Sequence, residues 1–499
     1  MNSSTKKSTG SVSSSLAFRA VLALLLMVGF YVLALAVAGL LIFLIFIQIA
    51  SRIFNAYLSV FCLFGAWIIM WSIFPRIDRF IPPGPRLEAK NHPRLFAELE
   101  SIAGAVGQSM PAEVYLIPEV NAWVGQRGGF MGIGSRRIMG LGLPLLETLN
   151  VSQLEAVLAH EFGHYYRGDT MLGPWVYKTR NSLIRTVNSL RRHSSVLRSP
   201  FLAYGKMYLR VTQTVSRRQE YCADELSVRM AGSENSVSAL LVMHGAAPAW
   251  HAYWNNEVAP VVREGFIPPV AAGFSSFTHV EAVAKQVNQI IDKQSKDQKT
   301  DPYDSHPSLH DRLAALENLP AGTHTTNQTP AISLLENVPQ LETELLTPIA
   351  KRLKIENLKP VKWDDVFVSV YLPSWHTIVR EQESVLNGLT TDLLSETPKS
   401  IADLERRLKG VAKLTAQQQK NLAIYTVGIA LTLALIKQGW SVHTSIGETV
   451  VLSKDGRSIK SFTILPRLIS GDLSGAGWLN ICGELGISNL NLDAKSITG

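Results

Sequence analysis

The sequence contains little cysteine and little charge. Its 499 residues include only three cysteines, Cys62, Cys222 and Cys482, which are far apart and odd in number. This excludes a disulfide-stapled scaffold and a multi-cysteine metal cluster. With 18% charged and 46% hydrophobic residues, the chain is too apolar to be a disordered polymer. Its length is typical of two or three domains.

The net charge of +8 is modest for this length. A domain that binds nucleic acid is usually strongly basic, and the composition does not indicate one, so we expect no nucleic-acid partner. A modest positive excess is compatible with contact between the protein and an anionic membrane surface.

Two long runs lack charge altogether, residues 20–51 and residues 53–75. A helix needs about 20 apolar residues to cross a hydrocarbon layer of about 30 Å, so both runs are long enough. A cleaved signal peptide is the alternative, because residues 36–38 resemble a small-residue cleavage site. Hydrophobicity continues beyond that site and a second run follows at once, which favours two transmembrane helices within residues 16–76. We expect residues 1–15 to be disordered.

The charges that flank these runs predict their orientation. Only Arg52 lies between the runs, whereas basic residues precede the first and follow the second: Lys6, Lys7 and Arg19 before, and Arg76, Arg79, Arg86, Lys90 and Arg94 after. The positive-inside rule therefore places both ends in the cytoplasm. A reducing compartment also agrees with the absence of paired cysteines.

The rest of the chain has a mixed α+β pattern that is mainly helical. We expect a globular domain over residues 77–322, a linker over 323–334 and a C-terminal α+β domain over 335–499. The predicted elements are a helix over 93–107, strands over 113–117 and 138–141, a helix from the capping box Ser152–Glu155 to residue 168, long helices over 170–232 with a break at residues 199–200, and a loop over 292–305.

The segment most typical of a catalytic site is His160-Glu161-Phe162-Gly163-His164. Two histidines four residues apart lie on one face of a helix, so both imidazoles can bind one tetrahedral zinc ion. The glutamate between them projects beside that face and can accept a proton from the attacking water. The alternative is an ordinary helix whose histidines are satisfied at the surface or in the core.

A catalytic zinc site needs a third protein ligand. The residue ten after His160 is Thr170, so a third histidine is missing from the metzincin position. Glu220-Tyr-Cys-Ala-Asp224 can supply the ligand: Glu220 would bind the metal, and Asp224 would accept the spare ring N–H of a ligating histidine. Without the histidine motif, this pair would be read as a solvated acidic face.

With these motifs the sequence resembles the membrane zinc metallopeptidases that include HtpX and the CAAX prenyl proteases. The resemblance covers roughly residues 86–316. It rests on the following segments in this order: Asn121-Ala122-Trp123, residues 140–146, residues 158–164 with Asp169, residues 220–224, and Ser305-His306-Pro307 with Arg312.

The resemblance implies a gluzincin-type fold with one zinc ion per chain. It implies His160, His164 and Glu220 as metal ligands and Glu161 as the general base. Asp224, Asp169 and Arg312 would support the ligands, although Arg312 can also cap the helix that begins near residue 308. Asn121, Ala122 and the strand over 138–141 would hold substrate in extended form. His306 would stabilise the oxyanion, or simply lie in a capped loop.

The two named members of this family suggest different substrates. A single N-terminal hairpin resembles HtpX more than the many-span prenyl proteases. This implies a bacterial inner-membrane endopeptidase that cleaves extended or misfolded membrane proteins in quality control. The alternatives are a proteolytically inactive zinc-containing adaptor or chaperone and a prenyl-protein protease. Protein substrates and the lipid bilayer are the expected partners; the sequence leaves the oligomeric state open.

The C-terminal residues depart from the family pattern and carry no recognisable chemistry. Residues 421–436 form a charge-free stretch that is shorter than the roughly 20 residues needed to span a bilayer. We therefore favour a buried helix over a third span. Residues 450–459, centred on Asp455-Gly456, are typical of a β-hairpin.

Overall fold

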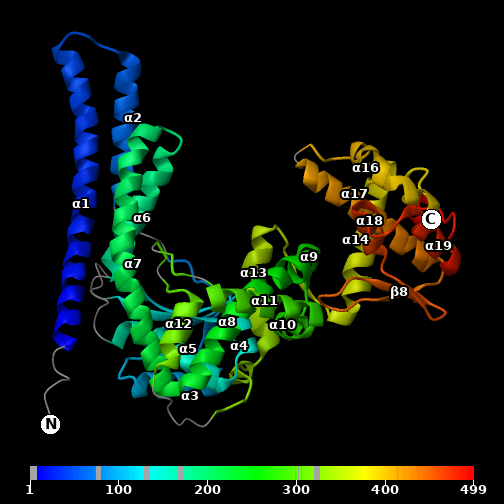
Figure 1. The fold of residues 1–499 in the computed structure, drawn as a ribbon, viewed down its shortest axis with the longest axis horizontal. Helices are drawn as coiled ribbons and strands as arrows, with labels where there is room; N and C mark the ends of the chain where they lie inside the picture. The colour runs from blue at the N-terminus through cyan, green and yellow to red at the C-terminus, as the bar shows by residue number, and fades with distance from the viewer. Residues whose placement is uncertain are drawn as a thin grey trace. The chain divides into compact units, whose positions relative to one another are not determined.

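A computed structural model describes residues 8–74, 80–128, 135–166, 173–297, 299–301, 303–304, 306–319, 326–412 and 414–498. The protein is mainly helical with small sheets (Figure 1). It divides into two compact units. The first contains Met1–Pro248 and Gln286–Leu341, and the second contains Ala249–Lys285 and Glu342–Gly499. This division differs from the boundary expected at residues 323–334, because residues 249–285 pack with the C-terminal part of the chain.

The N-terminal hairpin consists of α1 (Ser8–Ala50) and α2 (Ala56–Ile73). Val21–Ala50 and Ala56–Ile73 are long and apolar enough to cross a membrane, as predicted. The side chain of Asn55 caps α2 by accepting a hydrogen bond from the backbone N–H of Leu58 at 3.1 Å. Helix α1 already begins at Ser8, inside the stretch that we expected to be disordered.

A second helical hairpin packs along the first one (Figure 1). It consists of α6 (Gly173–Leu190) and α7 (Ser195–Ala231). The predicted break at residues 199–200 is wrong. The turn lies at residues 191–194, where Ser194 caps α7 by accepting from the N–H of Leu197 at 3.3 Å, and Pro200 lies inside α7. Gly232, with a φ of 85°, ends α7 as predicted.

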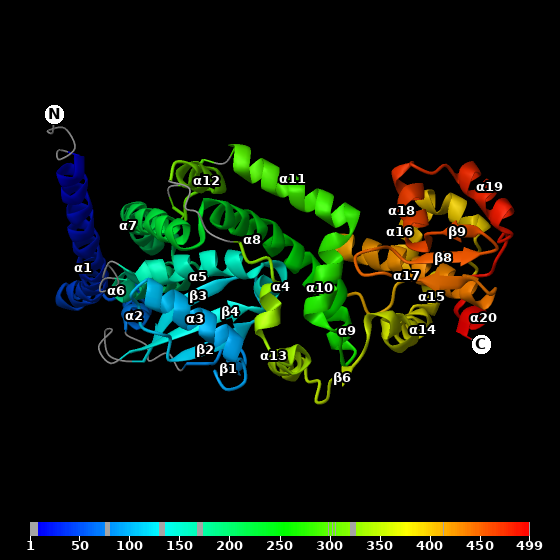
Figure 2. The ribbon, with the colours of Figure 1, turned by 90° about the horizontal axis from the view of Figure 1, so that it is seen from below.

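A four-stranded sheet lies at the base of the first unit (Figure 2). Its strands are β1 (Arg86–Leu87), β2 (Glu113–Ile117), β3 (Ala122–Arg127) and β4 (Arg136–Gly142). Their order is β1-β2-β4-β3, and only β2 and β4 are parallel. Strand β4 is therefore internal and β3 forms an edge. Helices α4 (Leu143–Thr148) and α5 (Val151–Tyr166) pack with this sheet, and α3 (Pro93–Ala105) packs with α5.

Helix α5 begins with a reciprocal cap that differs from the predicted one. Oδ1 of Asn150 accepts from the N–H of Gln153 at 2.8 Å, and Oε1 of Gln153 accepts from the N–H of Asn150 at 3.0 Å. The hydroxyl of Ser152 instead accepts from the N–H of Asn327 at 2.8 Å. Carbonyls of Asn327 and Thr329 accept from the first two N–H groups of α5. This part of the expected linker is thus bonded to the start of α5.

Three helices complete the first unit around α5 and α7. They are α8 (Ser233–Tyr253) and α11 (Glu281–Asp297), which both continue across the division between the units, and α12 (Leu309–Glu317). Because α11 continues to Asp297, the first part of the loop expected over 292–305 is helical.

The second unit surrounds α17 (Ala416–Lys437). Its helices also include α9 (Ala259–Arg263), α10 (Val270–His279), most of α13 (Val338–Arg352), α14 (Leu372–Glu381), α15 (Glu383–Leu386), α16 (Thr397–Arg406), α18 (Ser461–Ser470), α19 (Gly475–Leu485) and α20 (Ala494–Thr498). Its strands are β5 (Phe266–Ile267) with β6 (Lys359–Pro360), and β7 (Ser441–His443), β8 (Val451–Lys454) and β9 (Arg457–Ile459).

Helix α17 is long and apolar enough to be a third span by length and composition. It nevertheless lies in a protein core, because Val427, Ile429 and Leu435 are buried together with Trp478. This packing favours the buried helix that we predicted. The hairpin of β8 and β9 turns at Asp455 and Gly456, with φ of 50° and 75°, as expected for a tight two-residue turn.

We predict that Asn150→Ala destabilises the first unit by about 1 kcal/mol, because one end of the reciprocal cap is lost. Thermal unfolding in detergent measures this effect. Asn150→Asp keeps an accepting oxygen and should unfold close to the wild-type temperature. Equal losses for the two variants would contradict the proposed role of the cap.

Candidate metal centre

Two helices bring the predicted metal ligands together. Helix α5 carries His160 and His164 one turn apart, with ring centroids separated by 4.9 Å and ring planes at 89°. Helix α7 carries Glu220, whose side chain is 6% exposed. One ligand atom from each of these residues lies within 4.8 Å of the others. Two distant parts of the sequence therefore contribute to one cluster.

Small residues allow α5 and α7 to approach closely. A Cβ added to Gly163 would lie 2.9 Å from Cα of Ala223 and 3.1 Å from its Cβ. The hydroxyl of Ser227 on α7 donates to the carbonyl of Ala156 on α5 at 2.8 Å, which ties the two helices together. Gly163 lies between the two histidines, and Ala223 lies between Glu220 and Asp224, so both motifs contain the residues that let them meet.

The cluster fits a divalent metal ion. Nε2 of His160 lies 3.5 Å from Oε2 of Glu220, and Nε2 of His164 lies 3.6 Å from Oε1 of the same carboxylate. Oε2 of Glu220 is buried, and in the described part of the chain no donor reaches it in good hydrogen-bond geometry. Two imidazoles and one carboxylate are the protein ligands of a known class of catalytic zinc sites. A bound cation would satisfy the buried carboxylate oxygen.

Asp224 and Arg312 lie behind His160. Oδ1 of Asp224 is 3.0 Å from Nδ1 of His160. The guanidinium of Arg312 donates to both oxygens of Asp224, from Nε at 2.9 Å and from Nη2 at 2.5 Å. Ser308, rather than Arg312, caps α12 by accepting from the N–H of Asp311. Asp224 is thus placed to orient the His160 ring, and Arg312 to hold Asp224.

His306 also reaches the cluster, although its side chain is 62% exposed. Its Nδ1 lies 3.2 Å from Oε2 of Glu220. Its backbone N–H donates to Oδ1 of Asp304 at 3.1 Å, so the residue lies in a locally capped loop as well. Asp169, which we grouped with the supporting residues, lies outside the described residues.

The carboxylates and the burial of the site set its proton affinities. Burial alone would lower the pKa of His160, but contacts with Asp224 and Glu220 outweigh it and raise this pKa to about 9. Burial, together with the charge on His160, lowers the pKa of His164 to about 4. Burial also raises the pKa of Glu161 to about 7. Glu220 has a lowered pKa because contacts with His160 and His306 outweigh its burial.

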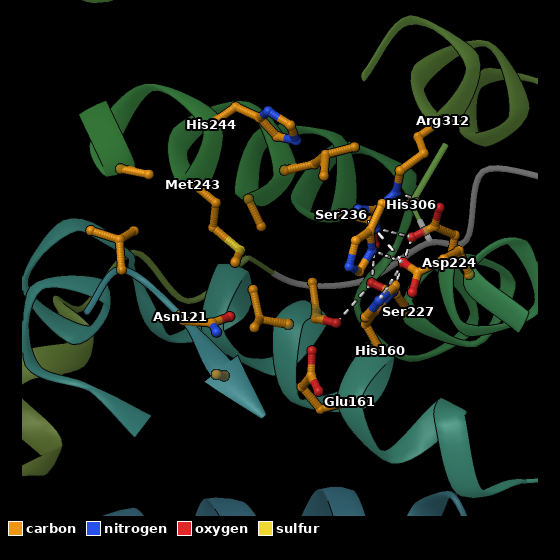
Figure 3. Close-up of a pocket in the computed structure, with 18 of the residues that line it drawn as sticks. Asn121, His160, Glu161, Asp224, Ser227, Ser236, Met243, His244, His306 and Arg312 are labelled. Carbon is orange, nitrogen blue, oxygen red and sulfur yellow. Dashed lines mark hydrogen bonds and ion pairs between the residues drawn. The ribbon is translucent and has the colours of Figure 1, made fainter. Parts of the chain in front are cut away.

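A cavity of about 570 Å³ opens beside the cluster (Figure 3). Glu161, Asn121 and Ala122 line it. We expected the strand over 138–141 to hold the substrate backbone. This expectation is wrong, because the backbone of β4 is already hydrogen-bonded to β2 on one side and to β3 on the other. In the described part of the sheet, β3 is the edge strand next to the cavity.

Sequence reasoning missed the wall that α8 contributes to the cavity. Ala239, Leu240, Met243 and Ala247 recur at helical spacing along this wall. His244 lines it too, with Nδ1 3.1 Å from Oε1 of Gln294. Apolar residues at this spacing are equally typical of an ordinary core helix, so no motif distinguishes α8 as part of a site.

Comparison with known proteins agrees with this geometry. Residues 89–320 match the model of peptidase family M48. Protease HtpX of Acinetobacter baylyi is 24% identical over 258 residues, which are 47% of this chain and 76% of that protein. Protease HtpX of Idiomarina loihiensis is 26% identical over 208 residues, 37% of this chain and 70% of that protein. No solved structure matches the chain significantly.

The apolar hairpin, the two-histidine helix and the distant glutamate therefore define a membrane metallopeptidase. Within that class, the chain is similar to the HtpX proteases of family M48.

We predict that Gly163→Ala weakens metal binding by about 10-fold to 100-fold, the usual loss when the support of a metal ligand is disturbed. The added methyl group would press against the backbone of α7 and move Glu220 away from the histidines. Zinc affinity measured against a competing chelator tests this.

Gly104→Ala is the matched control, because an added Cβ in α3 meets no atom within 4 Å. It should leave the zinc affinity unchanged. Wild-type affinity in Gly163→Ala would show that the close approach of the helices does not position the ligands.

We also predict that metal affinity rises with pH. The pKa of His160 is about 9 in the metal-free protein, so below that pH a proton must leave the imidazole before it can bind a metal. Affinity should then increase about tenfold per pH unit between pH 7 and 9, with about one proton released per ion. His164, with a pKa of about 4, is already neutral in this range.

Calorimetry in buffers of different ionisation enthalpy measures the released proton. Asp224→Asn removes a carboxylate that raises the pKa of His160, so this variant should show a shallower pH dependence. A pH-independent affinity in the wild-type protein would contradict the assignment of His160 as a ligand that is protonated without metal.

Proposed function

We propose that the protein is a zinc-dependent endopeptidase that hydrolyses peptide bonds in extended or misfolded proteins, including membrane proteins, as part of quality control. One observation supports this most strongly: His160, His164 and Glu220 converge beside a cavity that Glu161 also lines. The match to family M48 and to the HtpX proteases supports the reaction class.

His160, His164 and Glu220 would hold one zinc ion. When bound, zinc supplies a Lewis acid that polarises the scissile carbonyl and lowers the pKa of water. The carboxylate of Glu161 accepts a proton from the attacking water and passes it to the amine that leaves. A pKa near 7 suits this exchange, since the group can both take and give a proton near neutral pH.

The supporting residues have separate roles in this proposal. Oδ1 of Asp224, 3.0 Å from Nδ1 of His160, would accept the Nδ1 proton and so keep Nε2 directed toward the metal site, and Arg312 fixes Asp224. His306 lies at the exposed side of the cluster, where it would donate a hydrogen bond to the developing oxyanion.

The edge strand β3 provides a way to bind substrate. An extended peptide can add to a sheet edge through main-chain hydrogen bonds, without a fixed sequence. Asn121 and Ala122 lie at the start of β3 and line the cavity. A substrate strand laid there would carry its backbone toward Glu161. We propose β3, in place of β4, as the strand that aligns the substrate.

The hairpin of α1 and α2 would anchor the enzyme in a bacterial inner membrane. The basic residues that flank the two spans support a cytoplasmic catalytic unit. In that position the cavity would meet substrates on the cytoplasmic side.

We predict that Glu161→Gln lowers the rate of cleavage by about 100-fold to 10,000-fold, the usual contribution of a general base, while zinc content stays at one ion per chain. The assay is fragment mapping of an unfolded protein in detergent, with and without chelator. Glu225→Gln is a control on α7 that removes only an exposed pair with Arg229 and should retain activity.

Cleavage by Glu161→Gln at the wild-type rate would contradict the proposed mechanism. An unchanged cellular phenotype in this variant would instead indicate an adaptor that keeps zinc for structure. Cleavage of a farnesylated peptide but not of an unfolded protein would select the prenyl-protein protease.

A further inference from the structure

The positive charge of the chain is concentrated in the second helical hairpin, α6–α7. No Asp or Glu occurs between Asp169 and Glu220, whereas ten Lys and Arg residues do. The other 38 Lys and Arg residues of the chain are outnumbered by its 40 Asp and Glu residues. The excess of positive charge therefore resides in this one element. Its basic residues are Lys178, Arg180, Arg185, Arg191, Arg192, Arg198, Lys206, Arg210, Arg217 and Arg218.

One face of this hairpin is fixed to the membrane-spanning helices. Leu190, Phe201 and Tyr208 are buried in a core shared with α1 and α2. The hydroxyl of Tyr204 donates to the carbonyl of Leu26 on α1 at 2.6 Å. Nε of Arg185 donates to the carbonyl of Ser72, near the end of α2, at 3.2 Å. The hairpin is thus packed lengthwise against the spans.

The turn of the hairpin lies at the level of the middle of α2. A Cβ on Gly65 would lie 3.0 Å from Leu197 and 3.3 Å from Nε2 of His193, and the His193 ring stacks on Phe61 with centroids 4.8 Å apart. Gly65 is eight residues before Ile73, or about 12 Å at the rise of an α-helix. Since α2 is about 27 Å long by the same rise and the hydrocarbon layer is about 30 Å thick, α2 fits within the layer, and the turn lies at bilayer depth.

The turn presents cations next to an apolar side chain. Arg191 and Arg192 are exposed, Arg198 is half-buried, and Val196 is 78% exposed. Exposed cations next to an exposed apolar side chain are typical of segments that bind the interface of an anionic membrane. Arginine at this depth is costly unless its guanidinium reaches phosphate groups or water drawn inward by local thinning of the bilayer. Phosphate is also the group that guanidinium binds bidentately.

We propose that α6–α7 is a re-entrant hairpin that enters the bilayer beside α1 and α2 and binds the phosphate groups of anionic phospholipids through Arg191, Arg192 and Arg198. The leaflet involved is the one next to the catalytic cavity, because α7 continues without interruption from this turn to Glu220 and Asp224. Lipid headgroups drawn toward the turn would thin that leaflet beside the spans.

The first test measures lipid selectivity of the full-length protein. Detergent-solubilised protein is mixed with equal amounts of phosphatidylglycerol and phosphatidylcholine, and the lipid retained after chromatography is quantified by mass spectrometry at low and high salt. We expect phosphatidylglycerol to be preferred, and the preference to fall about fivefold for each arginine changed to glutamine. Arg→Lys variants at the same positions should keep much of it.

Exposed lysines of α11 supply the matched control. The triple variant Lys285→Gln, Lys293→Gln and Lys296→Gln removes the same charge from the surface outside the hairpin. It should retain the wild-type preference. If this lysine variant and the variant with Arg191, Arg192 and Arg198 all changed to glutamine lost the preference for phosphatidylglycerol equally, only net charge would matter. That result would overturn the proposal. Displacement of the lipid by inorganic phosphate or by single-stranded RNA at matched charge concentration would overturn it as well.

The second test measures depth and does not depend on peptidase activity. A spin label on Val196→Cys, read in nanodiscs that contain phosphatidylglycerol, should be accessible to oxygen and protected from a water-soluble nickel reagent. A label on Gln286→Cys, an exposed position on α11, should show the reverse, and labelled wild-type protein corrects for the native cysteines. If the nickel reagent reached the two labels equally, the result would contradict entry of the hairpin into the membrane.

Discussion

The site depends on the contact between Gly163 and Ala223. At this point α5 and α7 approach so closely that one methyl group would separate them. Gly163 lies between the two histidines and Ala223 lies between Glu220 and Asp224, so each ligand is within one turn of the contact. Every other feature of the centre, including the buried carboxylate and the contact between His160 and Asp224, requires this small distance between the two helices.

Local patterns predicted the chemistry better than they predicted the connections between elements. Helical periodicity was enough to place His160 and His164 together, and the same rule paired Glu220 with Asp224. The N-terminal spans, β2 and the turn at Asp455-Gly456 follow equally from short-range hydrophobicity and backbone preference. The distance between α5 and α7 is different, because it depends on two small residues about 60 positions apart that no local pattern relates.

The errors in prediction also have physical causes. Ser199-Pro200 lies inside α7 because the capping serine is five residues earlier, at Ser194, and a proline near the start of a helix loses few bonds. The cap of α5 is Asn150 rather than Ser152, whose hydroxyl is used by a distant backbone group. Strand β4 is internal because strand order is set by long-range pairing, which sequence alternation does not encode.

If β3 aligns the substrate as proposed, its position at the edge of the sheet has a consequence for which proteins would be left intact. A sheet edge offers hydrogen bonds only to a backbone whose own N–H and C=O groups are free. In a stable helix or in the interior of a sheet these groups are already paired. A well-folded neighbour in the membrane would thus be spared without any recognition signal, and a damaged one would become a target by losing its own hydrogen bonds.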